Sequence, residues 1–454
     1  MKTLCNPRRT IAGILRFAVR AACWAGASRQ HHGRSVALML PVIVLASLQY
    51  VVARPEAPSG EVVYEWNQQL IDTVRAGLQP PTNRVERSYA MLHIAIFDAV
   101  NSIEKRYTPF GFHVQSSAGA SAEAAAAQAG HDILAGLYPT RAAVYDAALA
   151  ATLAKIPPGR ARQGTRVGAA IAALVLAWRS DDRWNAIPPL YPASDVPGEW
   201  RPTPPGFSAA TFTHYPDVVP FAIESPAQFL APPPPALESA DYTAAFNEVK
   251  AIGSATNQLR TAQQTQLARL HASVGTFATP NTVWNGIARD VSRAQGLGLV
   301  ETARLFALLN VVFHDALQVS FTGKYFYGLW RPVTAIRNAG DDFNADTTQE
   351  DNWTPLLNAP PYPSYPGNAA ALSAASARAL ALALKTDDVE FNVVFEGNGM
   401  PNVTNSYSGF WEAAEEQAQS RVWGGIHFSF ESVASQQSSF ALVDWVYARF
   451  MRPR

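Results

Sequence analysis

Apolar residues recur at three- and four-residue steps through most of this chain, and this spacing constrains the fold more than any other feature. It is clear in ERSYAMLHIAIFDAVNSI (86–103), in GAAIAALVLAWRS (168–180) and again from Glu301 to Phe321. Such spacing places apolar side chains on one face of an α-helix, whereas a half-buried strand needs strict alternation. No run alternates persuasively, so the sequence predicts an all-α fold of packed helical bundles.

A proline-rich segment interrupts the helical pattern between residues 187 and 236. It holds 14 of the 33 prolines, including all of 232–235. Proline fits neither a helix interior nor a central strand, and a structureless connection of this length is uncommon. We therefore expect the segment to wrap the surface between an N-terminal helical half (55–186) and a C-terminal helical half (237–454). Thr261 and Gln264, in the second half, have the spacing of a helix capping box.

The charge balance excludes several classes of protein. The chain has 454 residues, with 36 basic and 36 acidic side chains and a hydrophobic share of 48%. This composition argues against a disordered chain and against a nucleic-acid binder. Because no net charge attracts an anionic substrate over long range, any anion site has to be built from a few converging side chains.

The first 54 residues have the composition of an export signal. Arginines are followed by an apolar run (36–53), and no acidic residue precedes Glu56. We expect a periplasmic or secreted mature chain that begins near Arg54, with no membrane span of its own. An uncleaved N-terminal anchor is the alternative, since the run is near the lower limit of a bilayer span. Cys5 and Cys23 lie in this segment, so cysteine chemistry is excluded from the body of the chain.

Three strings carry the candidate chemistry, and the first is KYFYGLWRPVTAIR (324–337). Lys324 and Arg331 are seven residues apart, which is close to two turns of a helix, so both cations can project on one side. Pro332 indicates a helix break or a new helix start at this point. Taken alone, such a pair is most often a solvated basic face.

The second string, PPYPSYPGNAAALSAASARAL (360–380), is a proline-rich loop that enters a helix at about Gly367. Backbone N–H groups at a helix start are unpaired, and the helix dipole adds positive potential, so the two together form an anion seat. Taken alone, an ordinary junction between loop and helix is the better interpretation.

The third string is SRVWGGIHFSFES (420–432). Gly424 and Gly425 permit a chain reversal, which lets Arg421 and His427 point into one cavity. The planar fork of arginine suits an oxyanion. Glu431 follows His427 by four residues, so it is placed to hydrogen-bond one ring nitrogen and to fix the tautomer.

Together the strings resemble the three-part signature that vanadium haloperoxidases share with type 2 phosphatidic acid phosphatases. The matching elements are Lys324-x6-Arg331-Pro332, the SYPGNAA loop and Ser420-Arg421-x5-His427. The similarity to bacterial haloperoxidase-like proteins also includes VVYEWN, WRPTPPGF and SPAQF. It therefore extends over most of the mature chain.

The resemblance implies a role for each matching residue. His427 coordinates vanadium in a haloperoxidase or attacks phosphorus in a phosphatase, and either role needs a neutral imidazole held by a partner. Glu431, the implied partner, stands where the family usually has aspartate. The oxygens of vanadate, or of phosphate in the same site, are implied to be bound by Lys324, Arg331, Gly367, Asn368 and Arg421.

The middle string departs from the family pattern, Pro-Ser-Gly-His. Aligned without a gap, this chain has Pro366, Gly367, Asn368 and Ala369, so the serine hydroxyl and the acid/base histidine are both missing. General acid/base catalysis typically contributes about 10²- to 10⁴-fold. The departure therefore predicts impaired turnover unless another group substitutes.

One other histidine is a candidate for the missing acid/base group, and a second is a candidate packing residue. His314 adjoins Asp315 and is nearest in sequence to the first string, but a structural role is favoured for it. His93, one turn before Asp98, is expected to pack in the interior.

The leading hypothesis is a vanadium haloperoxidase-like enzyme, in which vanadate takes up hydrogen peroxide and oxidises a halide. One alternative is an acid phosphatase with His427 as its nucleophile, and the other is a degenerate protein that only binds anions. All three act on small molecules and not on nucleic acid. The sequence leaves a homo-oligomer open.

Overall fold

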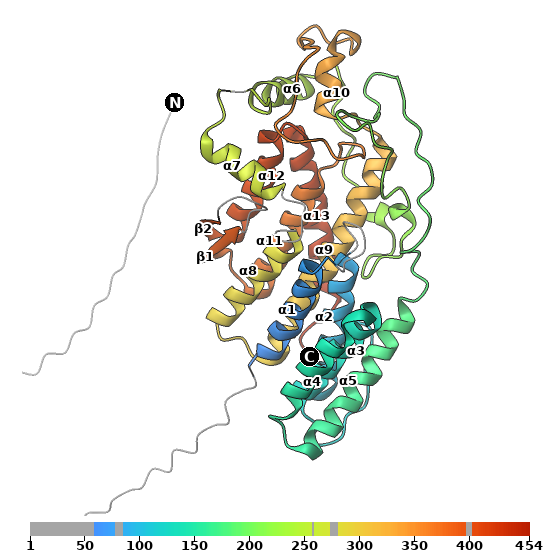
Figure 1. The fold of residues 1–454 in the computed structure, drawn as a ribbon, viewed down its shortest axis with the longest axis vertical. Coiled ribbons are helices and arrows are strands. Elements are labelled where there is room, and N and C mark those ends of the chain that lie inside the picture. The colour runs from blue at the N-terminus through green and yellow to red at the C-terminus, as the bar shows by residue number, and fades with distance from the viewer. Residues whose placement is uncertain (1–58, 78–84, 257, 273–279, 396–401) are drawn as a thin grey trace, which may run out of the picture. The chain divides into compact units, whose positions relative to one another are not determined.

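The computed structural model describes residues 59–77, 85–256, 258–272, 280–395 and 402–454. These ranges are predominantly helical, with one small sheet (Figure 1). The predicted all-α class is confirmed. Residues Pro55–Arg454 cluster into one compact unit. The export signal predicted for residues 1–54 lies outside the described residues.

The described helices fall on either side of the proline-rich segment. Before it are α1 (Glu61–Arg75), α2 (Val85–Glu104), α3 (Ala122–Leu137), α4 (Ala142–Leu153) and α5 (Pro158–Trp178). After it are α6 (Ala240–Ile252), α7 (Ala262–His271), α8 (Pro280–Ala294), α9 (Leu299–Tyr327), α10 (Pro332–Arg337), α11 (Asn368–Leu384), α12 (Phe410–Trp423) and α13 (Ser429–Arg449). The capping box predicted at Thr261 begins α7, with both of its hydrogen bonds to Gln264 present.

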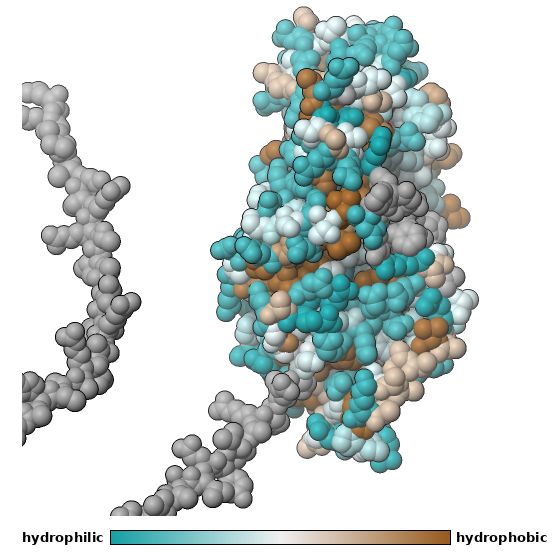
Figure 2. All heavy atoms as spheres, turned by 60° about the vertical axis from the view of Figure 1, so that its left-hand side comes forward, coloured by the Kyte–Doolittle hydropathy of each residue, from teal (hydrophilic) through white to brown (hydrophobic). Residues whose placement is uncertain are grey.

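Helix α9 is the axis of the fold. It packs against α1, α2, α8, α11 and α13 and so joins helices from both sides of the proline-rich segment. Among the described helices it alone has the length and hydropathy of a membrane span, but 94% of its most apolar window is buried inside the protein. On the face drawn in Figure 2, hydrophilic side chains predominate and apolar ones form narrow bands. The C-terminal end of α9 leads directly into the candidate site.

Residues 187–236 run over the helical body as the long green trace in Figure 1. Their regular structure consists of two short 3₁₀ turns, Tyr215–Asp217 and Pro226–Phe229. The buried carboxylate of Asp315 on α9 anchors the segment, because it accepts hydrogen bonds from the backbone N–H groups of Phe221, Ala222 and Ile223 at 2.8, 2.8 and 3.2 Å. Three otherwise unpaired donors are thereby satisfied away from water.

The one sheet in the described part is an antiparallel pair, β1 (Asp388–Phe395) and β2 (Val403–Gly409). Phe391, Val393 and Phe395 alternate inward along β1, whereas the residues between them are exposed. This alternation spans only five residues, too few to predict a strand from the sequence. The pair covers α8 and adds a small element to an otherwise helical fold.

Helices α3 and α5 pack closely because α5 places glycines where they meet. A Cβ built on Gly168 lies 2.4 Å from the carbonyl oxygen of Ala125, and one built on Gly164 lies 2.2 Å from that of Ser121. Both distances are far inside van der Waals contact, and the atoms encountered belong to the backbone. Gly159, near the start of the same helix, has nothing within 4 Å of a built Cβ.

Replacing Gly168 with alanine should therefore destabilise the protein by about 2 kcal/mol or more, because overpacking forces two helices apart. Gly159→Ala should be neutral or stabilising by up to about 1 kcal/mol, since alanine is the better helix former. Urea unfolding of both variants measures the difference. Equal stabilities for the two variants would show that the α3–α5 contact tolerates separation.

Candidate functional site

The described structure brings the three strings together at the C-terminal end of α9. Gly328, in a left-handed conformation with φ 62°, ends α9, and Arg331 is the N-cap of α10. Lys324 and Arg331 therefore lie on different elements rather than on one helix face, and the start expected at Pro332 is present. Gly425, with φ 75°, makes the predicted reversal between α12 and α13.

Lys324 is completely buried, and its ammonium group holds the second string. Its Nζ donates to the carbonyl oxygens of Pro363, Ser364 and Pro366 at 3.0, 2.6 and 2.6 Å. These bonds occupy all three ammonium donors. Burial, and next the charge of Arg331, lower the pKa of Lys324 well below its ordinary value. Lys324 thus contributes the position of the loop and a nearby positive charge.

Arg331 is also completely buried and connects the second and third strings. Its Nε donates to the carbonyl oxygen of Tyr362, and Nη1 donates to that of Ile426, both at 2.9 Å. Nη1 also lies 3.2 Å from His427 Nε2. The ring of Tyr362 lies 5.0 Å from the guanidinium carbon. Nη2 is buried and has no hydrogen-bond partner in the described structure, so one donor of this cation is left for a ligand.

The hydrogen bonds of His427 define its tautomer. Nδ1 lies 2.6 Å from Oε2 of Glu431, as the four-residue spacing predicted. A guanidinium only donates, so Nε2 accepts from Arg331 and the proton resides on Nδ1. Burial lowers the pKa of His427 to about 4, although Glu431 opposes this shift. The imidazole is therefore neutral near pH 7, with its Nε2 lone pair directed toward the cations.

Glu431 joins the second and third strings through its hydrogen bonds. Its partner Ser364 was not predicted from the sequence. Its Oε1 accepts from the hydroxyl of Ser364 at 2.6 Å and from the backbone N–H of Phe428 at 2.9 Å. Burial alone would raise the pKa of Glu431, but His427, Lys324 and the backbone N–H of Phe428 lower it overall. Ser364 lies inside the quoted PPYPSYPGN string, yet nothing in its spacing identifies a carboxylate 67 residues away.

The start of α11 contributes the backbone part of the site. Gly367 is the N-cap, as predicted, and a Cβ on it would lie 3.8 Å from that of Glu431. The N–H groups of Gly367 and Asn368 donate no hydrogen bond to another described residue. Ser320 on α9 donates to Oδ1 of Asn368 at 2.6 Å, which orients the amide.

Arg421, in the last turn of α12, supplies the remaining cation. It is partly exposed, and its guanidinium makes no hydrogen bond to another residue that the structure describes. Burial lowers its pKa to about 10, and the charge of Arg331 acts in the same direction. The two arginines are therefore close enough to repel each other, and an anion between them would relieve that repulsion.

His314 and His93 do not replace the missing acid/base group. His314 is buried beside Asp315 and packs edge-on against Phe221 at 4.7 Å, so it belongs to the anchor of the wrapping segment. His93 Nε2 accepts a hydrogen bond from the side-chain amide N–H of Asn67, and its ring packs on Phe306, as expected of an interior residue. Ala369, at the position aligned with the family histidine, is buried.

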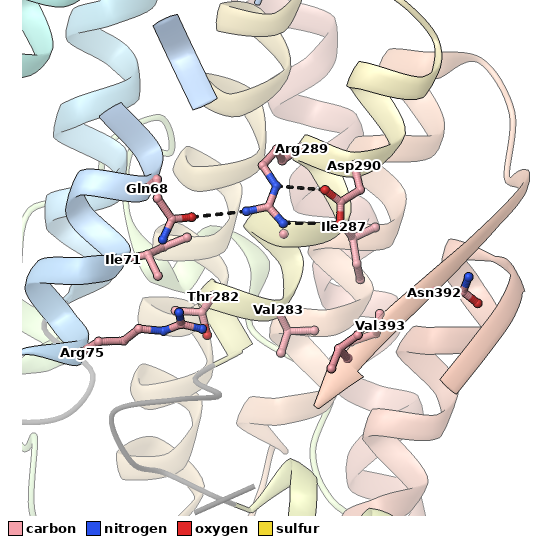
Figure 3. A pocket seen from close by; sticks show the side chains of 12 residues that line it. Gln68, Ile71, Arg75, Thr282, Val283, Ile287, Arg289, Asp290, Asn392 and Val393 are labelled. Carbon is pink, nitrogen blue, oxygen red and sulfur yellow. Dashed lines mark hydrogen bonds and ion pairs between the residues drawn. The ribbon is translucent and has the colours of Figure 1, made fainter. Parts of the chain in front are cut away.

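A separate pocket lies between α1, α8 and β1 (Figure 3). None of the predicted site residues lines it. The guanidinium of Arg289 points across it to Gln68 and Asp290, with Nη1 donating to Gln68 Oε1 at 3.3 Å and Nε donating to Asp290 Oδ1 at 2.9 Å. Its cation is therefore already paired with a carboxylate.

The fold and the candidate site define an all-helical protein with a buried, cationic oxyanion seat beside a neutral histidine. Residues 304–454 match the family model for the VCPO second helical-bundle domain. Vanadium chloroperoxidase of Curvularia inaequalis is 23% identical over 274 residues, which are 48% of this chain and 45% of that protein. The chain thus matches less than half the length of that curated relative.

Solved structures share the fold over most of this chain. A bacterial vanadium-dependent iodoperoxidase superposes with a TM-score of 0.74 at 23% identity, over 88% of this chain and 99% of that one. The holo form of a bacterial vanadium-dependent chloroperoxidase gives 0.66 at 14% identity, over 87% and 98%. The domain matched at residues 304–454 and the shared fold support the resemblance to the vanadium haloperoxidase-like superfamily that was drawn from the sequence.

The depressed pKa of His427 predicts a pH dependence of stability. Between about 4 and its ordinary value of 6.5, the unfolded state binds a proton at this residue and the folded state does not. Its contribution to stability is therefore present above pH 6.5 and is lost as the pH falls toward 4. From pH 7 to pH 5 the wild type should lose about 2 kcal/mol more than His427→Gln.

Urea unfolding at the two pH values measures this difference. His113→Gln serves as the control, because His113 is exposed and its removal should leave the wild-type dependence in place. Identical pH dependences for wild type and His427→Gln would mean that His427 is not held neutral by burial.

Proposed function

We propose that this protein is a vanadium haloperoxidase-like enzyme that uses vanadate and hydrogen peroxide to oxidise a halide. Its turnover is impaired, because the acid/base histidine of the family motif is absent. The observation that carries the proposal is the buried Nε2 of His427, kept neutral and unprotonated and faced by arginine. The domain match at residues 304–454 and the fold shared with vanadium-dependent peroxidases support the same conclusion. A phosphate ester is the competing substrate, because vanadate and phosphate fit the same seat.

The described residues fit a tetrahedral oxyanion. Nη2 of Arg331 is buried without a partner, Arg421 has its guanidinium donors available, and the first N–H groups of α11 are unpaired. These donors are of the kind that bind vanadate or phosphate oxygens. His427 Nε2 would be the ligand of vanadium, and it would exchange its contact with Arg331 for that bond.

The protein residues position and neutralise the bound group. The arginines offset the negative charge of the oxygens, and Lys324 fixes the loop that carries the α11 start. Glu431 keeps the Nδ1 proton in place, so Nε2 stays an electron-pair donor. Bound vanadate would supply Lewis acidity that activates peroxide toward a halide.

The proton-transfer part of the site is the part that differs from the family pattern. Ala369 cannot exchange a proton, and the hydroxyl of the family serine is absent at Gly367. Without these groups, proton movement depends on solvent, and turnover should fall by about 10²- to 10⁴-fold relative to an intact site. Gly367 has room for the serine, since a Cβ there is 3.7 Å from its nearest neighbour, Ser435 Oγ.

The proposal is tested by binding and by turnover. Wild type should bind orthovanadate in calorimetric titration, and His427→Gln and Arg331→Gln should each weaken binding at least about tenfold, because each removes a direct contact. Bromide- and peroxide-dependent dye halogenation should be slow in wild type. It should rise about 100-fold or more in Gly367→Ser/Asn368→Gly/Ala369→His, which restores the family motif.

Arg378→Gln is the matched control for charge, because Arg378 is a surface residue paired with Asp444, and it should bind vanadate like wild type. Hydrolysis of p-nitrophenyl phosphate by wild type without any halogenation would favour the phosphatase. Vanadate binding without turnover of either substrate, unchanged in the restored variant, would identify a protein that only binds anions.

We also propose that the chain is exported and that its substrates are small molecules. The basic and apolar N-terminal segment supports export. Expression of the full chain in a bacterial host, followed by fractionation and N-terminal sequencing, should yield mature protein that begins near Arg54. Full-length protein retained in the membrane fraction would instead indicate an N-terminal anchor.

A further inference from the structure

A groove of about 600 Å³ lies between α6 and α13 on the outside of the candidate site. Tyr365, Ser429 and Phe430 line the groove. They come from the same two segments, 363–366 and 427–431, that contact Lys324 or contain His427 and Glu431. The prolines of the wrapping segment form a third wall. No part of the candidate oxyanion seat lines this groove.

Small side chains keep the groove open. Asp241, Ala244, Ala245 and Glu248 follow one another at helical spacing along α6, and Ala434 faces them from α13. Alanine leaves space between helices that a larger side chain would fill. Val433 is 54% exposed and lines the groove.

Aromatic and proline rings form the apolar surface of the groove. Phe430 is partly exposed, stacks on Phe428 at 5.2 Å and lies 6.1 Å from the ring of Tyr365. The Tyr365 hydroxyl donates to the carbonyl oxygen of Pro232, which fastens the proline wall to the site loop. The apolar wall is therefore joined to the site loop by a hydrogen bond and by ring contacts.

The charged side chains that line the groove are both acidic. Asp241 and Glu248 are exposed and form no ion pair or side-chain hydrogen bond with another described residue. Among the residues that the structure describes, no lysine, arginine or histidine lines the groove. Two carboxylates beside aromatic rings attract a cation both through direct charge and through the negative faces of the rings.

We propose that the groove between α6 and α13 binds an organic ammonium ion with an apolar body. The ammonium group lies between Asp241 and Glu248, and the apolar body packs on Phe430, Val433 and the prolines. An anionic compound of the same shape is repelled. This binding needs neither vanadate nor catalytic turnover, so it stands apart from the proposed function.

Benzyltrimethylammonium is the probe, titrated calorimetrically into the full chain beside benzenesulfonate, which has a similar ring and the opposite charge. The ammonium should bind and the sulfonate should not. Asp241→Asn/Glu248→Gln should weaken ammonium binding at least about fivefold, because exposed charge pairs each contribute a few-fold. Ala244→Trp should abolish it by filling the groove.

The matched control is Asp181→Asn/Glu224→Gln, which removes two exposed carboxylates outside the groove and should bind like wild type. Equal binding of the sulfonate, or an unchanged affinity in both groove variants, would overturn the proposal. Equal weakening in the control double variant would also overturn it, since that result reflects net charge alone. Urea unfolding of each variant verifies that it is still folded.

Discussion

The carboxylate of Glu431 is the interaction on which the candidate site depends. It is completely buried and accepts from a loop hydroxyl, a backbone N–H and an imidazole N–H at once. A buried carboxylate is tolerated only when its oxygens are paired in this way. Because its three partners come from two separate strings, satisfying this one group also fixes the relative positions of the loop, the start of α13 and His427.

The candidate site around Glu431 contains more cationic than anionic side chains. Lys324, Arg331 and Arg421 bring three cations together, while Glu431 is the carboxylate that shifts the pKa values of Lys324, Arg331 and His427. Like charges held close in a low-dielectric environment are costly unless a counter-ion is present. The folded protein therefore carries a standing preference for an anion, which is independent of the chemistry that follows binding.

Sequence reasoning succeeded where local spacing determines structure. The helices at 86–103, 168–180 and 301–321, the start at Gly367, the reversal at Gly425 and the hydrogen bond between His427 and Glu431 all follow from spacings of a few residues. It failed where distant segments decide a contact. Nothing near Ser364 predicts its carboxylate partner, and nothing near Lys324 shows that its three donors go to loop carbonyls. The hairpin of β1 and β2 was missed because its inward alternation is too short to distinguish from chance.

The hydrogen bonds from Lys324 to residues 363–366 separate the position of the site loop from the proton chemistry at the start of α11. Because the ammonium and three carbonyls hold residues 363–366, the position of this loop does not rest on the side chains at 367–369. The contacts that position the loop and the residues that depart from the family's proton-transfer groups therefore belong to different parts of the chain.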